Sequence, residues 1–187
     1  MRVTSPRLPL IALVAAAALV SLAGCSPEPA VPPAPPTAPA EPLFATDAEA
    51  LAAAEAAFEE YLAVTNKILM EGGEGEEKLR PLVSDEVFNA ESAGFASRKE
   101  KGWKSVGGTK LMSAELQQIS NGIEEAEVIT FVCLSYENVD VVDRSGESVI
   151  SPDRPPFAMY EAVFRFVAPD TWTLERNTFW ETPESCS

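Results

Sequence analysis

The sequence contains few side chains able to carry out acid–base or metal chemistry. Its 187 residues include three cysteines, three tyrosines and no histidine. Histidine is the usual general base near neutral pH and the commonest metal ligand, so a Ser-His-Asp or Cys-His arrangement is excluded within this chain. The acidic run Glu71–Glu77 could attract calcium, but it lacks the spaced ligands of a calcium loop. We therefore expect no catalytic residue, no metal and no cofactor, and we interpret the run as a solvated turn.

Cys25 follows a segment typical of protein export. Arg2 and Arg7 precede an almost wholly apolar stretch, residues 8–22, which is too short to span a membrane comfortably. The stretch ends in Leu22-Ala23-Gly24-Cys25 and resembles the bacterial lipobox. This resemblance implies that residues 1–24 are a signal peptide cleaved after Gly24, and that Cys25 carries diacylglycerol. Two fatty-acyl chains such as palmitate would anchor the protein stably at the extracytoplasmic face of the cell membrane. The alternative is an ordinary secretory signal followed by an incidental cysteine.

The other two cysteines are Cys133 and Cys186. In an exported protein they lie in an oxidising compartment, where paired thiols form disulfides. We predict that they pair and that the bridge ties the end of the chain across the sheet. A redox pair or a metal site is the alternative, although no Cys-x-x-Cys motif accompanies them.

A proline-rich segment separates the lipobox from the rest of the chain. Residues 26–42 contain eight prolines in 17 positions, and proline prevents a helix or sheet from propagating. Such a segment favours polyproline II at about 3.1 Å per residue, which gives a reach on the order of 50 Å. We interpret residues 25–45 as the lipidated cysteine with a Pro/Ala-rich tether, and residues 46–187 as one domain. A ligand for aromatic grooves is the alternative for the tether.

Helical signals dominate the first part of the predicted domain. Thr46 and Glu49 match a capping box, apolar residues then recur at helical spacing, and Gly72-Gly73 end the pattern. Ser84 has the character of a second N-cap. We expect two helices, over Thr46–Leu69 and Ser84–Lys101, and a helical turn between them over Glu76–Leu82.

Beyond Gly107-Gly108 the apolar pattern alternates as in strands. Asn121-Gly122 is a strong hairpin signal, and Asp143–Gly146 indicates a turn. Glu125–Tyr136 has apolar residues at odd and even positions, which predicts a strand covered on both sides. The expected strands are Thr109–Ser120, Glu125–Tyr136, Val139–Val142, Ser148–Ile150, Phe157–Val167 and Trp172–Trp180. Helices followed by a run of antiparallel strands indicate an α+β fold.

The predicted domain resembles the nuclear transport factor 2-like (cystatin-like) superfamily and, more narrowly, small actinobacterial lipoproteins with that fold. The resemblance rests on Leu51–Leu69, Glu91–Phe95, Val106–Lys110, Phe131–Leu134, Val139–Asp143 and the closing strands. It implies N-terminal helices packed in a strongly curved antiparallel sheet, shaped like a cone with a pocket at its open end.

Enzymes of this superfamily place a His-Asp pair, or a lone aspartate with a tyrosine, in that pocket. Without histidine, the chain offers Tyr61, Tyr136 or Tyr160 with Glu91 or Glu161. The simpler interpretation is that these carboxylates lie at the surface and pair with Arg98, Arg165 or Arg176. The candidate pocket-lining residues are Phe58, Tyr61, Glu91, Trp103, Tyr160, Phe164 and Trp180. At helical and strand spacing, the aromatic members of this set are more often part of a plain core.

The chain is strongly acidic, with 14 basic and 29 acidic residues. Only 12 of the basic residues follow Cys25, which gives the mature part a formal charge of −17. Such a polyanion repels nucleic acid and anionic membrane surfaces, so we expect membrane attachment through Cys25 alone. Our hypothesis is a non-enzymatic binding or accessory domain that engages an envelope protein or a small apolar ligand. The alternatives are an isomerase or hydro-lyase with an acid/tyrosine pocket, and a folded spacer without a ligand.

Overall fold

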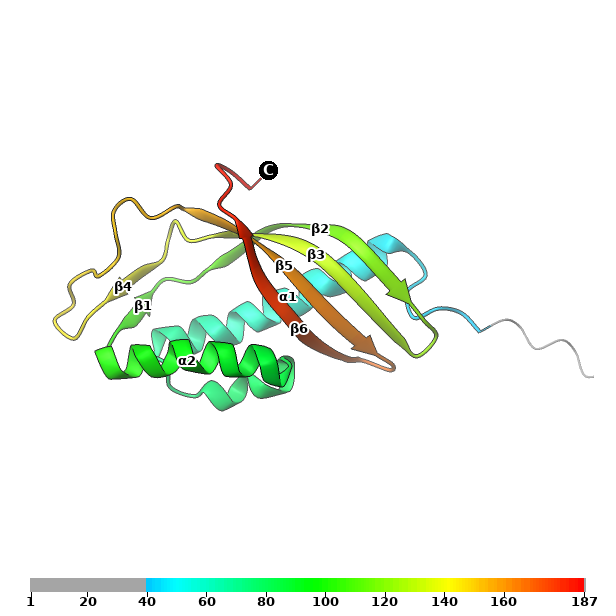
Figure 1. The fold of residues 1–187 in the computed structure, drawn as a ribbon, viewed down its shortest axis with the longest axis horizontal. Helices are drawn as coiled ribbons and strands as arrows, with labels where there is room; N and C mark the ends of the chain where they lie inside the picture. Colours follow the sequence, from blue (N-terminus) through cyan, green and yellow to red (C-terminus); the bar gives the residue numbers. More distant parts are fainter. Residues whose placement is uncertain (1–39, 187) are drawn as a thin grey trace, which may run out of the picture. The chain divides into compact units, whose positions relative to one another are not determined.

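The computed structural model of this protein describes residues 40–186. The predicted signal peptide, the lipidation of Cys25 and most of the tether lie outside these residues. Two α-helices with two short 3-10 turns between them come first, and six strands follow (Figure 1). The elements are α1 (Asp47–Met70), η1 (Glu76–Lys78), η2 (Arg80–Leu82), α2 (Asp85–Lys101), β1 (Lys104–Val106), β2 (Lys110–Asn121), β3 (Glu125–Ser135), β4 (Asp140–Val142), β5 (Phe157–Val167) and β6 (Thr171–Glu181). The α+β class predicted from the sequence is confirmed.

Helix α1 begins with the expected capping interactions. Thr46 Oγ1 accepts a hydrogen bond from the Glu49 amide at 3.1 Å, and Glu49 Oε2 accepts one from the Ala45 amide at 2.8 Å. These contacts satisfy amides that have no partner inside the helix. The helix ends before Gly72 and Gly73, which both have positive φ angles, 78° and 93°, a conformation that glycine adopts at little cost.

Helix α2 is capped by Ser84 and is tied to the sheet at the same point. Ser84 Oγ accepts a hydrogen bond from the Val87 amide at 3.3 Å and donates one to the Glu175 carbonyl oxygen at 3.0 Å. The Ser84 amide also donates to the Leu174 carbonyl oxygen at 3.0 Å. The start of α2 is thereby held against β6.

The four long strands form one antiparallel sheet in the order β2-β3-β5-β6, and β1 pairs with β4 in a separate small sheet. The hairpin predicted at Asn121-Gly122 is present, and its three-residue loop is closed by a hydrogen bond from the Gly122 amide to the Glu125 carbonyl oxygen at 2.8 Å. The strand predicted over Ser148–Ile150 is not formed. That segment makes a single bridge, between Ser148 and Val142, and it belongs to an exposed loop that buries little apolar surface.

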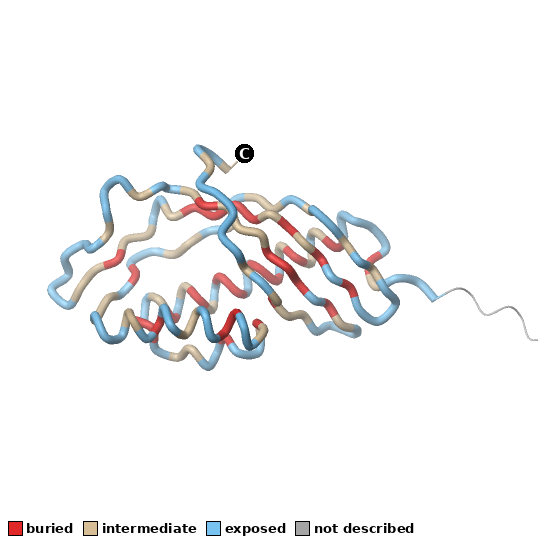
Figure 2. Tube along the Cα trace, in the orientation of Figure 1, coloured by how far each residue is buried: buried red, intermediate tan, exposed pale blue. Residues whose placement is uncertain are grey.

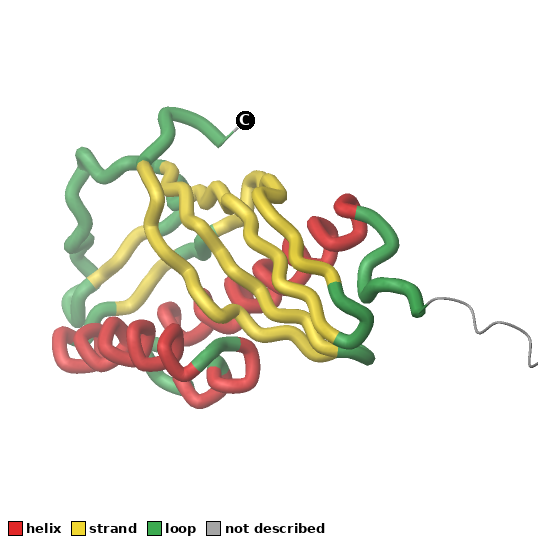
Figure 3. Tube along the Cα trace, turned by 45° about the vertical axis from the view of Figure 1, so that its right-hand side comes forward, coloured by secondary structure: helices red, strands yellow, loops and turns green. Residues whose placement is uncertain are grey.

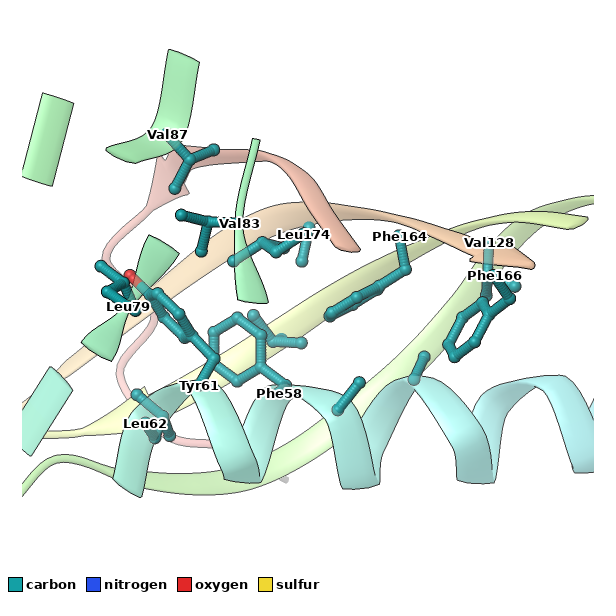
Figure 4. Packing of buried hydrophobic residues seen from close by; sticks show 14 of the residues in the cluster. Phe58, Tyr61, Leu62, Leu79, Val83, Val87, Val128, Phe164, Phe166 and Leu174 are labelled. Atoms are coloured by element: carbon teal, nitrogen blue, oxygen red, sulfur yellow. The ribbon is translucent and has the colours of Figure 1, made fainter. Parts of the chain in front are cut away.

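The core lies between α1 and the face of the sheet turned toward it, which we call the inner face. Inward residues of β3, such as Val128 and Val132, are buried, and they alternate with residues on the opposite, outer face (Figure 2). Phe58 on α1 meets Phe164 on β5 edge-to-face, with ring centroids 6.3 Å apart (Figure 4). Alanines at 50, 54 and 57 line the buried side of α1, and their small side chains allow the helix to approach the sheet closely.

The outer face of the sheet is only partly covered, so the prediction that β3 is covered on both sides holds at one end of the strand. Cys133 is buried there, beneath the C-terminal tail, whereas Ile129 and Phe131 are half-buried. Trp180 packs on Phe131 with ring centroids 4.8 Å apart and stays 56 % exposed. The helices lie on the other side of the sheet (Figure 3). Within residues 40–186, none of the helices combines the length and apolar character needed to cross a membrane.

Candidate functional site

The acid and tyrosine side chains singled out in the sequence meet at one point, between α1 and α2. Tyr61 donates a hydrogen bond from its hydroxyl to Glu91 Oε1 at 2.6 Å. Asn177 of β6 donates from Nδ2 to the same hydroxyl at 3.5 Å. Three elements that are distant in the sequence therefore converge on one phenolic oxygen, whose position near Leu79 and Phe58 is visible in Figure 4.

The protonation of this pair is set by burial. Tyr61 is 3 % exposed, and desolvation, followed by the negative charge of Glu91, raises the pKa of its phenol well above 10. Tyr61 therefore retains its proton and donates it to the carboxylate in a fixed hydrogen bond. Buried hydroxyl oxygens of Thr65 and Ser92, each close in sequence to one member of the pair, have no hydrogen-bond partner among the described residues. Buried oxygens of this kind commonly bond internal water.

The other two tyrosines lie together on a different part of the inner face. The hydroxyls of Tyr136 and Tyr160 are 3.4 Å apart, and burial raises the pKa of Tyr136. Both line a cavity of about 330 Å³, together with Arg154. Glu161 follows Tyr160 on β5 and so points to the outer face, where Arg176 donates to its Oε1 at 2.9 Å. The expected Glu161–arginine pair is present, whereas Glu91 pairs with Tyr61.

The remaining candidate pocket residues are dispersed. Phe58 and Phe164 are completely buried in the core, where neighbouring side chains fill the space between α1 and the sheet (Figure 4). Trp103 lies beyond α2 with the Lys101 ammonium 4.3 Å from its ring centroid. Trp180 lies on the outer face. Of the seven residues proposed from the sequence, only Tyr160 lines one of the cavities described here.

The predicted pair of cysteines is present as a disulfide. Cys133 on β3 and Cys186 have Cα atoms 5.7 Å apart and are bonded through their sulfur atoms. The bridge holds the tail that follows β6 against the outer face, where Ser185 and Cys186 lie near Phe131 and Met159.

A second place of interest, which the sequence did not indicate, is a cavity of about 420 Å³ at the start of α1. We call it the α1 groove. One wall is a stripe of α1 formed by Glu49, Ala53, Ala56, Ala57 and Glu60. These positions follow helical spacing, so they face the same way. The two glutamates stand at the ends of the stripe, about 16 Å apart along the helix axis at 1.5 Å per residue. The alanines lie between them, and we call this part of the stripe the floor of the groove.

The opposite wall of the α1 groove is the turn between β5 and β6. It contributes the aromatic rings of Phe166 and Trp172 and the carboxylate of Asp170. Phe166 is buried, Trp172 is half-buried and Asp170 is exposed. Apolar surface therefore lies at the bottom of the groove and negative charge at its rim.

The third wall is the segment that leads into α1. Phe44 is 8 % exposed and meets Phe166 edge-to-face, with ring centroids 5.2 Å apart. Asn121 fixes this segment with two hydrogen bonds, donating from Nδ2 to the Phe44 carbonyl oxygen at 2.7 Å and accepting at Oδ1 from the Phe44 amide at 3.1 Å. The Leu43 amide donates to the Gly122 carbonyl oxygen at 2.7 Å. The segment is therefore part of the folded unit, although the sequence placed residues up to 45 in the tether.

The sequence contained one signal for this groove, which the proline-rich composition of the preceding segment obscured. Leu43 and Phe44 are large apolar residues between a proline-rich stretch and an N-cap, and apolar residues just before a helix commonly pack against its first turns. Asp170 and Trp172 gave no such signal, because the approach of the β5–β6 turn to α1 depends on the tertiary fold.

The fold and the groove define an α+β protein with an acidic, aromatic-walled recess beside its first helix. No protein-family model matches the sequence, and no curated protein sequence is significantly similar to it. The chain is similar in structure to the crystal structure of the intermembrane space region of the chloroplast protein ARC6, with a TM-score of 0.50 and 10 % identity, over 70 % of this chain and 96 % of that one. At this identity the similarity concerns the fold alone.

Proposed function

We propose that this protein is a lipid-anchored lipoprotein of the cell envelope, and that its folded part is a non-enzymatic binding domain on the extracytoplasmic side of the membrane. The observation that carries the proposal is the Cys133–Cys186 disulfide in a chain that also carries the leader ending in Leu22-Ala23-Gly24-Cys25. Disulfides persist in oxidising compartments, and leaders of this kind direct export. The two features are independent of each other and support the same location.

We further propose that the folded part is a cone-shaped domain of the nuclear transport factor 2-like type. The order of helices before antiparallel strands supports this, as does the position of α1 across the inner face of the sheet. In this proposal the aromatic side chains between α1 and the sheet, such as Phe58 and Phe164, form the core of the cone. Binding takes place outside the cone, in the α1 groove.

Binding is favoured over catalysis because of the state of the acid/tyrosine pair. A general acid or base must exchange its proton near the working pH and must reach the substrate. Tyr61 is 3 % exposed, and its phenol has a pKa raised far from neutrality. The pair is better suited to joining α1 to α2 than to transferring a proton.

The location is tested by acylation of Cys25. Cells expressing the full-length protein are fed an alkyne-bearing fatty acid, and incorporation into the purified protein is measured by click labelling and mass spectrometry. We expect label on Cys25 in the wild type and none in Cys25→Ser. A double variant, Cys133→Ser with Cys186→Ser, is the matched control and should keep the label. Unlabelled wild-type protein with an intact leader would overturn the proposal.

Binding is tested inside the cell with a photo-crosslinking amino acid at one of two exposed alanines. Ala56 lies on the α1 groove, and Ala93 lies on α2 away from it. We expect a discrete crosslinked species from position 56 and none from position 93. Equal crosslinking from both positions, or none from position 56, would contradict a binding role for the groove.

A further inference from the structure

We propose that the α1 groove binds an extended, basic peptide segment of an envelope protein, with lysine or arginine side chains placed against Glu49 and Glu60. The inference deepens the proposed binding role and depends on it. Shape, charge and the construction of the groove each contribute to the assignment.

The shape of the groove fits a short extended chain. The floor between Glu49 and Glu60 consists of Ala53, Ala56 and Ala57, and small side chains leave room for a peptide backbone. An extended chain rises about 3.3 Å per residue, so the distance of about 16 Å along α1 corresponds to about five residues. The first and fifth residues of such a peptide are four steps, about 13 Å, apart, and the long side chains of lysine or arginine cover the remaining few ångströms to the two glutamates. Apolar residues between them face Phe166 and Trp172.

The charge of the groove selects a cationic occupant. Glu49, Glu60 and Asp170 all line it, and no lysine or arginine among residues 40–186 does so. None of these three carboxylates belongs to an ion pair within that range, whereas Glu125 and Glu161 on the outer face are paired with arginines. Lysine and arginine combine an apolar stem with a charged head, which matches an apolar floor with an acidic rim. Trp172 adds an aromatic ring with which a cation can make a cation–π interaction.

The groove is built from fixed elements, so little ordering is needed on binding. Asn121 holds Phe44 in place through two hydrogen bonds, and α1 is capped at Thr46 and Glu49. Strand β6 is an edge of the sheet, and Val83 and Ser84 contact its backbone at Leu174 and Glu175. An exposed edge beside Trp172 offers backbone groups to an extended peptide.

The position of the groove restricts the partner to the surroundings of the membrane. Leu43 lines the groove, and 17 residues separate it from Cys25. A chain of that length spans at most about 60 Å when fully extended. With Cys25 acylated, the groove can reach segments of membrane proteins and of other anchored proteins, and the acidity of the chain keeps it from binding the lipid headgroups themselves.

The test measures peptide binding to the full mature chain carrying Cys25→Ser. The probe is a fluorescent, end-blocked Lys-Leu-Ala-Leu-Lys peptide, compared by anisotropy with Glu-Leu-Ala-Leu-Glu. We expect the basic peptide to bind and the acidic peptide to bind at least about tenfold more weakly, because like charges oppose association. Glu49→Gln with Glu60→Gln should weaken binding of the basic peptide by about tenfold or more. Glutamine also serves at the third position of a capping box, so α1 remains capped.

A matched control removes the same charge from the same helix. Glu55→Gln with Glu59→Gln lies outside the α1 groove, and we expect less than about a twofold effect, as for charges at the rim of an interface. Ala56→Trp fills the floor without changing the charge and should abolish binding. An equal loss in the Glu55/Glu59 variant would show a general polyanion effect and overturn the proposal. So would retention of binding by Ala56→Trp, or binding of spermidine as tight as that of the peptide.

Failure of the groove and failure of the envelope location are distinguishable. The fatty-acid label on Cys25 does not involve the groove, so loss of peptide binding with intact labelling would overturn the groove assignment alone. Absent labelling with intact peptide binding would instead overturn the location.

Discussion

The hydroxyl of Tyr61 and the carboxylate of Glu91 lie 2.6 Å apart and join α1 to α2 across 30 residues of sequence. Tyr61→Phe keeps the ring packed on Phe58, 5.4 Å away between centroids, and leaves the half-buried carboxylate without its donor. A hydrogen bond to a charged group contributes about 1.5–3 kcal/mol, and we expect a loss of that size in the free energy of unfolding, measured by urea denaturation. Tyr160→Phe, whose hydroxyl contact is 3.4 Å, should have a smaller effect. Equal losses of unfolding free energy in the two variants would contradict a larger stabilising contribution from the Tyr61 hydroxyl.

The same contact predicts a dependence of stability on alkaline pH. The pKa of Tyr61 is higher in the folded chain than the ordinary value of 10.0, so above pH 10 the unfolded chain loses a proton that the folded chain keeps. The stabilisation is therefore fully present below pH 10 and is lost as the pH rises toward the folded pKa. Unfolding free energies measured between pH 8 and 11 should fall in the wild type and fall less steeply in Tyr61→Phe. Parallel profiles would contradict the burial of this proton.

Asn121 should be essential for fixing the segment before α1. Its side chain bonds both the amide and the carbonyl group of Phe44, and each such bond contributes about 1 kcal/mol. We expect Asn121→Ala to destabilise the protein by about 2 kcal/mol and to speed amide hydrogen exchange at Leu43 and Phe44. Gln117→Ala, at an exposed position of the same strand, is the control. Unchanged exchange at Phe44 in Asn121→Ala would show that the segment is held by apolar packing alone.

Three glycines form a graded series for alanine substitution. Gly107 has a φ of +78° and a Cβ there would overlap the Asn138 carbonyl oxygen, whereas Gly146 has a φ of +88° and faces open space. Gly94 lies inside α2, also with open space around it. We expect Gly146→Ala to cost about 1–2 kcal/mol, Gly107→Ala to cost more, and Gly94→Ala to stabilise by about 0.5–1 kcal/mol. Thermal unfolding of the three variants gives the order, and a harmless Gly107→Ala would contradict the close approach.

The disulfide should make a large contribution to stability. Cys133 and Cys186 are 53 residues apart, and closing a loop of that length restricts the unfolded chain by about 4 kcal/mol. We expect the Cys133→Ser, Cys186→Ser double variant to lose stability up to that value. A reductant should lower the melting temperature of the wild type and leave that of the double variant unchanged. A wild type insensitive to reductant after complete reduction would show that the bridge closes a loop already held by packing.

The sequence predicted those elements whose signals are local. The cap at Thr46, the glycines after α1 and the turn at Asn121-Gly122 are read from adjacent residues, and α1, α2 and the long strands follow from them. The prediction of a strand over Ser148–Ile150 was wrong. The alternating pattern there covers only three residues, which is too short to specify a strand within a long loop. Trp180 was expected near a pocket, but the register between β5 and β6 shifts between Val163 and Phe164. Beyond this shift the alternation along β6 is reversed, so Trp180 lies on the outer face beside Phe131.

The candidate site depended more strongly on tertiary structure. The acid/tyrosine idea named both Tyr61 and Glu91, but nothing in the sequence selected that pair among the six available combinations. The α1 groove was missed because its walls come from residues 43–60 and 166–172, and only the folded sheet brings them together. The proline-rich composition before Leu43 also concealed two apolar residues that belong to the folded unit.

The bond between Cys133 and Cys186 encloses the long exposed connection between β4 and β5. A protease that cuts this connection would separate β5 and β6 from the rest of the chain in sequence, yet the two fragments would remain one covalent molecule. Such a cut would therefore leave the two pieces joined through the disulfide, and the damage would become visible on a gel only after reduction.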